Sequence, residues 1–296
     1  MDITLIIGAT GLLGKSIMGS KEISKISSTK LLGVTRNRSL EPSEELIISD
    51  YSKESAKKIL FNYSNRIKNI IHCAGFPSVF MSLRDPINDH INNFDPVLFS
   101  LEIAKESKAK LFYISTVEMY GTDDCKDRSE TSPRNPQNPY ALNKMFSEEY
   151  IRLYQKIFGI NFNILRPSIF IGDTIKKNIV FEIINAYQNS LESIPIYVDL
   201  NSKLNFIHVD EVTNIIRFLF EKNINNEIFN VGMEKSLSVN DLLKYFKTKY
   251  DFAPKINQLD DEYQYKTAPI EKLKSFGWKP KRDIFHYLDE LVKIKI

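Results

Sequence analysis

Hydrophobic positions along the chain follow two alternating patterns. Short, β-branched apolar runs, typical of buried strands, occur at residues 3–7, 30–35, 45–48, 67–73, 110–115 and 161–165. Longer segments between them repeat apolar residues at helical spacing, at residues 15–26, 52–62, 88–107 and 138–158. Apolar strands that alternate with helices indicate a parallel sheet covered on both faces. The predicted fold class is therefore α/β, with a doubly wound parallel sheet.

The pattern loosens after Arg166. We expect helices at residues 178–189, 211–221 and 239–249 and strands at 205–209 and 227–231, followed by a mixed tail. The sequence shows no internal repeat, low-complexity tract or Gly/Ser linker. We therefore predict a first domain over residues 1–166, with return segments at about 203–232, and a smaller, interleaved C-terminal α/β lobe over residues 167–296.

Composition and charge are ordinary for a soluble globular protein: 43% of the 296 residues are hydrophobic and 26% are charged. The net charge of +3 comes from signs mixed along the chain, so neither nucleic acid nor an anionic membrane is expected as a partner. There is no leader-like N-terminus and no apolar run of about 20 residues, which favours a cytoplasmic protein. Cys73 and Cys125 lack the spacing of a metal site or a disulfide framework, so we expect no metal.

A glycine-rich turn follows the first predicted strand directly and opens a helix. Its sequence is Gly8-Ala9-Thr10-Gly11-Leu12-Leu13-Gly14. In such a turn the first glycine permits a tight bend, the second lets the backbone approach a pyrophosphate, and the third lets helix pack on strand. The helix N-terminus then offers unpaired N–H groups to the anion. An ordinary β-α loop is the alternative, but the position between strand and helix favours binding of NAD or NADP.

The end of the second predicted strand bears on the choice of dinucleotide. An acid there would bond the ribose 2′-hydroxyl of NAD, whereas an arginine suits the 2′-phosphate of NADP. The chain has no acid in this stretch but has Arg36 and Arg38. We therefore expect NADP, with NAD possible; the alternative is that both arginines are solvated surface charges. Asp50, after the third strand, could bond the adenine or simply cap its own loop.

A tyrosine and a lysine four residues apart are candidates for proton transfer. Tyr140 and Lys144 share one face of a predicted helix, which Asn138 would cap. A tyrosine has an ordinary pKa near 10, and a nearby ammonium favours the phenolate. Such a tyrosine can exchange a proton with a carbinol or carbonyl oxygen while hydride moves on the carbon. Thr116 follows a strand of the same half and could place a hydroxyl beside Tyr140.

The same spacing recurs at Tyr245 and Lys249, which shows that the spacing alone is a weak signal. We interpret that second pair as the surface of an amphipathic helix, because it lies far from the glycine turn in the sequence. Arg166, His72 and His208 are interpreted as structural residues.

Eight segments in order along nearly the whole chain carry a resemblance: Gly8–Gly14, Ile70–Gly75, Ile114–Gly121, Tyr140–Lys144, Leu165–Pro167, Phe206–Val212, Phe229–Gly232 and Phe276–Pro280. Together they resemble the extended short-chain dehydrogenase/reductase family, which contains nucleotide-sugar epimerases, dehydratases and reductases. The resemblance implies an N-terminal Rossmann domain and a smaller lobe that grips a nucleotide-sugar, usually in a homodimer.

The resemblance also implies roles for individual residues. Tyr140 would be the acid-base, Lys144 would hold the nicotinamide ribose and lower the tyrosine pKa, and Thr116 would polarise the sugar oxygen. The cofactor-binding residues would be Gly8, Thr10, Gly11, Leu12, Leu13, Gly14, Arg36, Asp50, Tyr51, Ala74, Asn93, Lys144 and Pro167.

Two departures from the family pattern narrow the function. Family dehydratases carry an aspartic acid where this chain has Val117, which cannot donate the proton that expels water. Glu118 is either a base or a plain polar residue. Many members also place an arginine on the substrate diphosphate where this chain has Leu204; Lys203 is a candidate substitute, without the bidentate fork.

Three functions are consistent with this set of residues. The first is an NAD(P)-dependent reductase of a nucleotide-linked 4-keto-deoxysugar, as in deoxysugar biosynthesis, which Arg36 and Val117 favour. The second is a nucleotide-sugar 4-epimerase that keeps NAD bound. The third is a non-catalytic dinucleotide sensor, against which the intact tyrosine, lysine and threonine argue.

Overall fold

A seven-stranded sheet organises the larger part of the molecule. The computed structural model describes residues 1–121, 128–172, 178–263 and 267–294, and of residues 258–263 only the backbone. The strands lie in the order β10-β6-β5-β4-β1-β2-β3, and every neighbouring pair is parallel. Their bounds are β1 Ile3–Ile7, β2 Lys30–Thr35, β3 Leu46–Ile48, β4 Ile67–His72, β5 Lys110–Ile114, β6 Phe162–Pro167 and β10 Glu227–Val231. The predicted doubly wound parallel sheet is confirmed.

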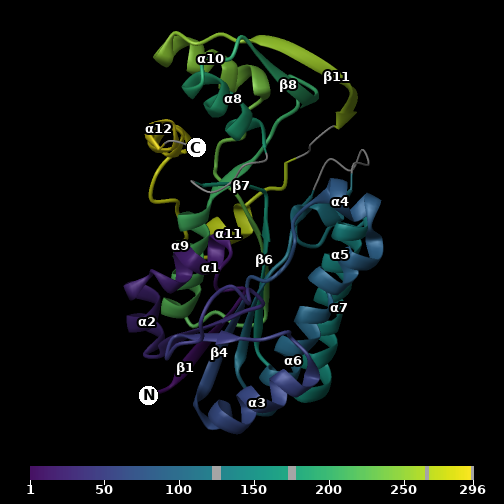
Figure 1. Cartoon of the computed structure of the whole chain (residues 1–296), viewed down its shortest axis with the longest axis vertical. Helices are drawn as coiled ribbons and strands as arrows, with labels where there is room; N and C mark the ends of the chain where they lie inside the picture. Colours follow the sequence, from purple (N-terminus) through teal and green to yellow (C-terminus); the bar gives the residue numbers. More distant parts are fainter. Residues whose placement is uncertain (122–127, 173–177, 264–266, 295–296) are drawn as a thin grey trace.

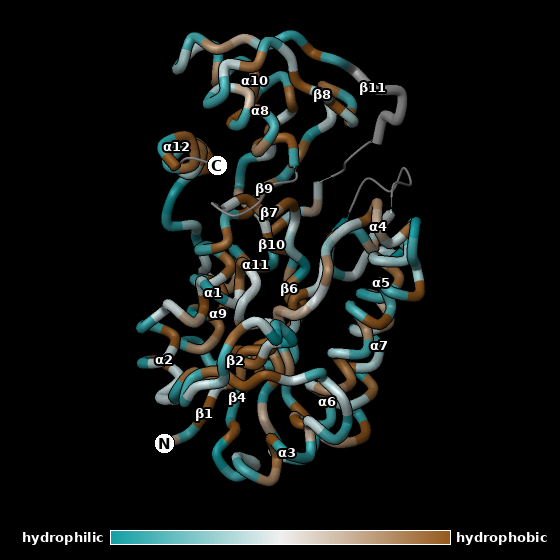
Figure 2. The backbone as a smooth tube through the Cα atoms, viewed as in Figure 1, coloured by the Kyte–Doolittle hydropathy of each residue, from teal (hydrophilic) through white to brown (hydrophobic). Residues whose placement is uncertain are grey.

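Helices cover both faces of this sheet (Figure 1). One layer holds α1 Leu12–Met18, α2 Lys21–Ser27 and α9 Val209–Glu221, and the other holds α3 Lys53–Tyr63, α6 Asp95–Ser107 and α7 Pro139–Phe158. Successive strand residues enter opposite cores, as Ile70 and Ile71 do in β4. Such strands are apolar throughout because both of their faces are buried, and Figure 2 shows this as hydrophobic colour at the centre of the molecule.

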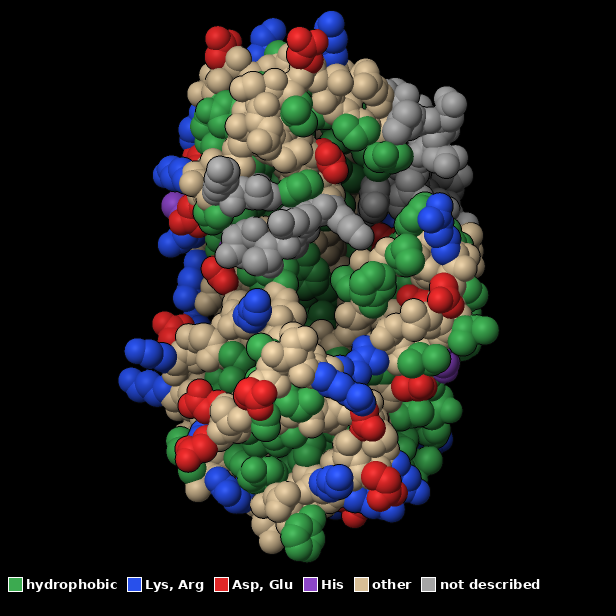
Figure 3. Space-filling model, viewed as in Figure 1, with side chains coloured by type: hydrophobic (Ala, Val, Ile, Leu, Met, Phe, Trp, Pro, Cys, Tyr) green, Lys and Arg blue, Asp and Glu red, His purple; other side chains and the backbone are tan. Residues whose placement is uncertain are grey.

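The second part of the molecule lies beyond the carboxyl ends of the main strands (Figure 1). Two parallel pairs of strands contribute to it, β7 Ile169–Ile171 with β9 Phe206–His208, and β8 Ser193–Val198 with β11 Lys255–Tyr263. Its helices are α8 Ile179–Gln188, α10 Val239–Tyr250, α11 Glu271–Ser275 and α12 Ile284–Lys293. Figure 3 shows a hollow with hydrophobic side chains between the two parts. Ligands of parallel α/β sheets bind outside the strand carboxyl ends, which is where this hollow lies.

Two of the predicted helices are each divided in the structure. Residues 15–26 form α1 and α2, because Ser20 accepts a hydrogen bond from the Ile23 N–H and caps a new helix. Residues 88–107 form α5 Pro86–Asn93 and α6, since Pro96 has no N–H to continue the first helix. The short helix α4 Val79–Arg84 precedes α5, and 3₁₀ turns occupy Ser64–Arg66 and Val117–Tyr120.

Candidate active site

The glycine turn after β1 is shaped by its first and third glycines. Gly8 has a φ of +85°, and a Cβ on it would lie 2.7 Å from the backbone nitrogen of Ala74. A Cβ on Gly14 would lie 2.2 Å from the Gly8 carbonyl oxygen. Neither distance is possible for a real side chain, so these positions require glycine. The turn is thereby pressed against both its own helix and the end of β4.

The middle glycine faces open space. A Cβ on Gly11 would have one neighbour within 4 Å, the Gly8 carbonyl oxygen at 3.4 Å. Gly11 also caps α1, and among the described residues no side chain bonds the first N–H groups of that helix. Leu12 is half-buried and Leu13 buried beneath the turn. Free helix N–H groups below a glycine without a side chain fit a pyrophosphate.

The end of β2 joins this turn and holds Arg36. The hydroxyls of Thr10 and Thr35 lie 2.7 Å apart. Arg36 donates to the Asn92 side-chain oxygen at 2.8 Å, and its guanidinium lies 5.2 Å from the centre of the Tyr51 ring. Arg36 is therefore held in place on the sheet edge, and is not a freely solvated surface charge.

Asp50 and Tyr51, the second and third residues after β3, differ in burial. Asp50 is exposed, and its carboxylate accepts from the Ser55 hydroxyl at 2.6 Å and the Ser52 N–H at 2.9 Å. These bonds hold the pKa of Asp50 well below its usual range and use its carboxylate to cap the start of α3. Tyr51 is buried, its hydroxyl donates to the Val34 carbonyl at 3.3 Å, and burial raises its pKa to about 12.

Helix α7 delivers the tyrosine and the lysine together. Its first turn is capped by Asn138, which accepts from the Ala141 N–H at 2.8 Å. Tyr140 and Lys144 are both buried on the same face, and the Lys144 ammonium lies 5.9 Å from the centre of the Tyr140 ring. Lys144 donates to the carbonyl of Ile114, the last residue of β5, at 2.9 Å. The pair is thus tied to the carboxyl edge of the sheet.

Thr116 lies directly beyond the end of β5. It accepts a hydrogen bond from the Glu118 N–H at 3.2 Å and bonds Tyr140 as well. Burial and the Glu118 carboxylate raise the pKa of Tyr140, and the Thr116 hydrogen bond opposes them only in part. Burial lowers the pKa of Lys144 to about 8. In this state, then, the phenol is neutral.

Asn93, from the end of α5, completes the floor of the site. Its side-chain oxygen accepts from the Phe76 N–H at 2.9 Å. A Cβ on Gly75 would lie 2.8 Å from that oxygen and 3.4 Å from the Lys144 nitrogen, so the three residues meet. Pro167, which ends β6, is buried at the same sheet edge.

Sequence reasoning missed two residues beside this cluster. Asp89 and Asn143 are buried, and the Asn143 amide donates to the Asp89 carboxylate at 2.8 Å. The only available signal was that Asn143 immediately precedes Lys144 and that Asp89 lies one helical turn before Asn93. A pairing over 54 residues is not visible in a local pattern.

The candidate diphosphate ligand Lys203 forms an exposed ion pair. Lys203 donates to the exposed Asp241 carboxylate at 2.7 Å, and Leu204 is buried in the core. The role of Lys203 as a substitute for the diphosphate arginine stays a prediction. His208 stacks on Tyr287 with ring centres 4.1 Å apart, as a structural residue does.

The remaining polar candidates are also structural. His72 is buried beside the Ser100 hydroxyl at 2.7 Å, and burial lowers its pKa to about 3. Cys73 is a free thiol whose pKa burial raises to about 12, and Cys125 lies outside the described residues. In the described ranges, no three His, Cys, Asp or Glu side chains are grouped as a metal would require. Nor does that part of the chain contain a helix long and apolar enough to span a membrane.

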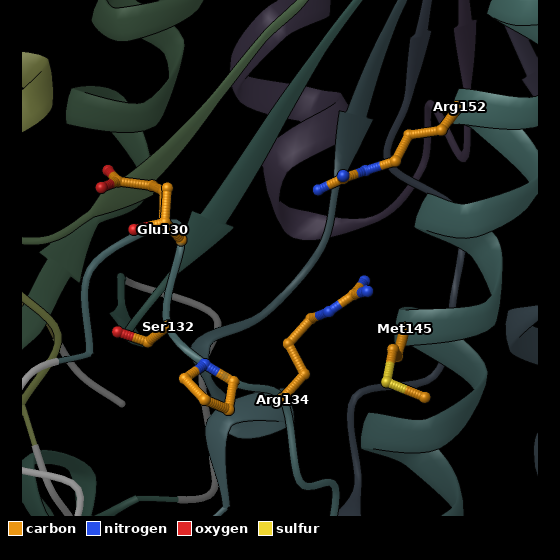
Figure 4. Close-up of a pocket in the computed structure, with 7 residues that line it drawn as sticks. Glu130, Ser132, Arg134, Met145 and Arg152 are labelled. Carbon is orange, nitrogen blue, oxygen red and sulfur yellow. The ribbon is translucent and has the colours of Figure 1, made fainter.

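A pocket of about 490 Å³ lies between α7 and the segment from Glu130 to Arg134 (Figure 4). The guanidinium groups of Arg134 and Arg152 point into it. Arg134 pairs with Glu149 at 2.6 Å, so most of its charge is compensated. Tyr140, Lys144 and Thr116 do not line this pocket, which is therefore separate from the proton-transfer residues.

Comparison with known proteins agrees with this geometry. Residues 4–232 match the model of the NAD dependent epimerase/dehydratase family. A putative UDP-glucose 4-epimerase of Methanocaldococcus jannaschii is 28% identical over 291 residues, which are 95% of this chain and 94% of that protein.

Two solved structures share the fold over nearly the whole chain. A UDP-N-acetylglucosamine 4-epimerase from Methanobrevibacter ruminantium, in complex with UDP-N-acetylmuramic acid, has a TM-score of 0.84 at 24% identity and covers 99% of this chain and 97% of its own. A UDP-glucuronic acid 4-epimerase from Bacillus cereus, with UDP-glucuronic acid and NAD, has a TM-score of 0.85 at 23% identity and covers 98% and 99%. The chain therefore belongs to the NAD dependent epimerase/dehydratase family, and so to the extended short-chain dehydrogenases/reductases.

Proposed function

We propose that this protein is a nucleotide-sugar 4-epimerase. The observation that carries the proposal is the meeting of Tyr140, Lys144 and Thr116 at the carboxyl end of β5, with the half-buried Val117 where a dehydratase needs an acid. The similarity of the whole chain to a putative UDP-glucose 4-epimerase supports it. This favours the epimerase over the reductase that we placed first from the sequence.

The residues divide the chemistry in a simple way. NAD, when bound, would supply the hydride acceptor and donor for the sugar carbon. Tyr140 takes the proton of the sugar hydroxyl and later gives it back. Thr116 positions the sugar oxygen beside the tyrosine through hydrogen bonds. Lys144, fixed by the Ile114 carbonyl, holds the ribose hydroxyls and provides the positive charge that favours the phenolate.

Replacing the tyrosine hydroxyl tests this assignment. Tyr140→Phe should abolish interconversion of 4-epimers in a panel of nucleotide-sugars, with little change in cofactor affinity. Tyr245→Phe is the matched control, because Tyr245 has a lysine at the same spacing but bonds Asp289 on α12; its turnover should stay near that of the wild type. Retained activity in Tyr140→Phe would refute the proposal.

Arg36 keeps a second candidate open, an NADPH-dependent reductase of a 4-keto sugar. The guanidinium is oriented by Asn92 and Tyr51 at the end of β2, where a 2′-phosphate would lie. An epimerase should be purified with stoichiometric NAD and need no added cofactor, whereas a reductase consumes NADPH in every turnover. If Arg36 binds the 2′-phosphate, Arg36→Ala should lower the affinity for NADPH much more than the affinity for NADH. Equal losses of affinity for the two cofactors would rule out this candidate.

We further propose that residues 167–296, apart from the segment at about 203–232, form the lobe that holds the nucleotide-sugar. This division follows the sheet, since β10 returns to pair with β6 while β7, β8, β9 and β11 lie outside the main sheet.

We also propose a homodimer formed through α5 and α7. These neighbouring helices line one edge of the molecule (Figure 1) and present large exposed apolar side chains at helical spacing. The side chains, between 37% and 75% exposed, are Ile87, Ile91, Leu142, Phe146, Tyr150, Leu153 and Ile157. A monomer gains nothing from exposing so large a row, whereas a second copy would bury it.

Light scattering of a charged variant tests the dimer. Leu153→Asp should shift the protein to the monomer mass, because it places a carboxylate within the row. The control is Phe61→Asp on α3, where a 91% exposed phenylalanine lies away from the row and the mass should not change. A monomeric wild type would contradict the proposal.

A further inference from the structure

A buried carboxylate lies behind the catalytic lysine. Asp89, on α5, is 4% exposed. Its two oxygens accept from the side-chain amides of Asn93 and Asn143, each at 2.8 Å. Asn143 directly precedes Lys144 on α7, and Asn93 meets Lys144 at Gly75. Asp89 thus joins the two helices at the turn that carries the lysine.

The hydrogen-bond directions in this cluster follow from one backbone group. The Phe76 N–H can only donate, so the Asn93 oxygen faces it and the Asn93 amide must face Asp89. The Asn143 amide faces the other Asp89 oxygen, and the Asn143 oxygen accepts from the His90 ring N–H at 2.9 Å. Burial raises the pKa of Asp89, but the amide donor on each oxygen and the charge of Lys144 oppose this shift and favour the ionised carboxylate.

The charges around Lys144 leave Asp89 as its counter-ion among the described residues. Six titratable groups face the lysine from β4, β5, α5 and its own helix: His72, Cys73, Tyr113, Asp89, Tyr140 and Glu148. Burial keeps the thiol, both phenols and the imidazole neutral by shifting each pKa. Glu148 is neutralised by Arg166 through hydrogen bonds of 2.6 and 3.0 Å. Only the Asp89 charge has no strong ion pair of its own.

We propose that Asp89 is a positioning residue that holds Lys144 as an ammonium behind Tyr140, through its charge and through its bonds to Asn93 and Asn143. The proposal rests on the role of Lys144 in the proposed function, and extends it to a carboxylate that does not touch the reacting atoms. The Asp89 charge is needed because burial alone favours a neutral lysine, and a neutral lysine cannot promote the phenolate.

Asp89→Asn removes the charge at constant size. The introduced amide can keep its hydrogen bonds if the Asn143 side chain rotates and His90 changes tautomer. The double variant Asp89→Asn/Asn143→Asp moves the carboxylate from position 89 to position 143, its hydrogen-bond partner. It still accepts from His90, and the amide at position 89 still accepts from Asn93. It therefore restores a charge beside Lys144 without changing the number of bonds.

NMR titration of the Lys144 Cε signal in ¹³C-lysine-labelled protein measures the effect directly. We expect the Lys144 pKa to fall by about one unit in Asp89→Asn, a tenfold change in its protonation equilibrium, and to return most of the way in the double variant. The signal is assigned with Lys144→Arg. Glu54→Gln, an exposed carboxylate on α3, is the control and should leave the titration unchanged.

Turnover gives a second readout. Because kcat falls as Lys144 loses its proton at alkaline pH, a lower Lys144 pKa moves this loss of kcat to lower pH. Asp89→Asn should therefore be several-fold slower than wild type at pH 8 and nearly equal at pH 6. An unchanged Lys144 titration in Asp89→Asn, or an equal fall in the double variant, would overturn the proposal.

A substitute variant and a readout that needs no substrate complete the test. If Asp89→Asn yields too little folded protein, Asp89→Ser admits water to the same space and must give the same shift of the lysine titration. The NMR titration does not depend on a substrate. A protein that turns over no nucleotide-sugar therefore refutes the proposed function, while the lysine titration still decides the role of Asp89.

Discussion

The buried ion pair between Arg166 and Glu148 can be tested by removing one partner at a time. Arg166 is the second-to-last residue of β6 within the sheet, Glu148 lies on the inner face of α7, and both side chains are fully buried. Two hydrogen bonds of 3.0 and 2.6 Å join them, and Arg166 also donates to the Tyr120 hydroxyl and the Glu130 carbonyl. Arg166→Met keeps most of the volume of the side chain but removes both hydrogen bonds from a cation to the Glu148 carboxylate. Arg134 lies 3.9 Å from that carboxylate but already pairs with Glu149 at 2.6 Å.

The expected cost is large because the remaining charge is desolvated. Breaking a buried ion pair by removing one partner costs about 3–5 kcal/mol, whereas replacing both partners with apolar residues is often neutral. In Arg166→Met/Glu148→Leu the Tyr120 hydroxyl keeps its bond to Asn230, and the Glu130 carbonyl loses one donor. We therefore expect the double variant to lose about 1–3 kcal/mol, less than Arg166→Met alone.

Equilibrium urea unfolding at pH 7 measures both losses as shifts of the midpoint at constant slope. Lys57→Met provides the control, because Lys57 pairs with Glu54 in an exposed ion pair at 2.8 Å on α3 and should cost less than about 0.5 kcal/mol. An Arg166→Met variant as stable as this control, or less destabilised than the double variant, would refute the reasoning.

Two other predictions concern the glycine turn and the C-terminal lobe. Gly14→Ala should lose both stability, by about 1–3 kcal/mol, and cofactor affinity, since its Cβ would clash with Gly8; Gly11→Ala should lose affinity alone. Calorimetry and urea unfolding separate the two, and the opposite pattern would contradict our description of the turn. Although burial raises the pKa of Asp289, bonds from Lys249, Tyr245 and Tyr250 outweigh it and lower the pKa to about 2. This stabilisation is complete above about pH 4 and is lost as pH falls through about 2, so Asp289→Asn should destabilise more at pH 7 than at pH 3; equal losses would argue against the ion cluster.

The features predictable from sequence were those encoded over a few residues. Gly8, Gly14 and the Tyr140–Lys144 pair are local, because a turn and one helical repeat fix their geometry. The seven-stranded sheet followed from apolar runs that need no knowledge of their partners. Arg166 could be identified as structural, but its partner Glu148 could not, since the pairing depends on how α7 lies on the sheet.

The misses have the same cause. The pairing of Lys203 with Asp241, 38 residues away, is not visible in a local pattern. The state of Tyr140 depends on burial and on Glu118, which spacing does not report. The short helix α4 and the strands β7, β8 and β11 were missed, although β9 was predicted, because their apolar patterns are short or interrupted by polar residues and resemble those of loops.

Helix α7 limits how this sequence can change in length. Over one rigid element it carries Tyr140 at the sheet edge, Glu148 against Arg166, and the exposed apolar row on its outer side. Deleting or inserting one residue between Tyr140 and Glu148 would rotate everything after it by about 100° relative to the tyrosine. Glu148 would then leave its partner and the apolar row would turn away together. Homologous sequences should therefore vary here by substitution and gain or lose residues only in the loops on either side.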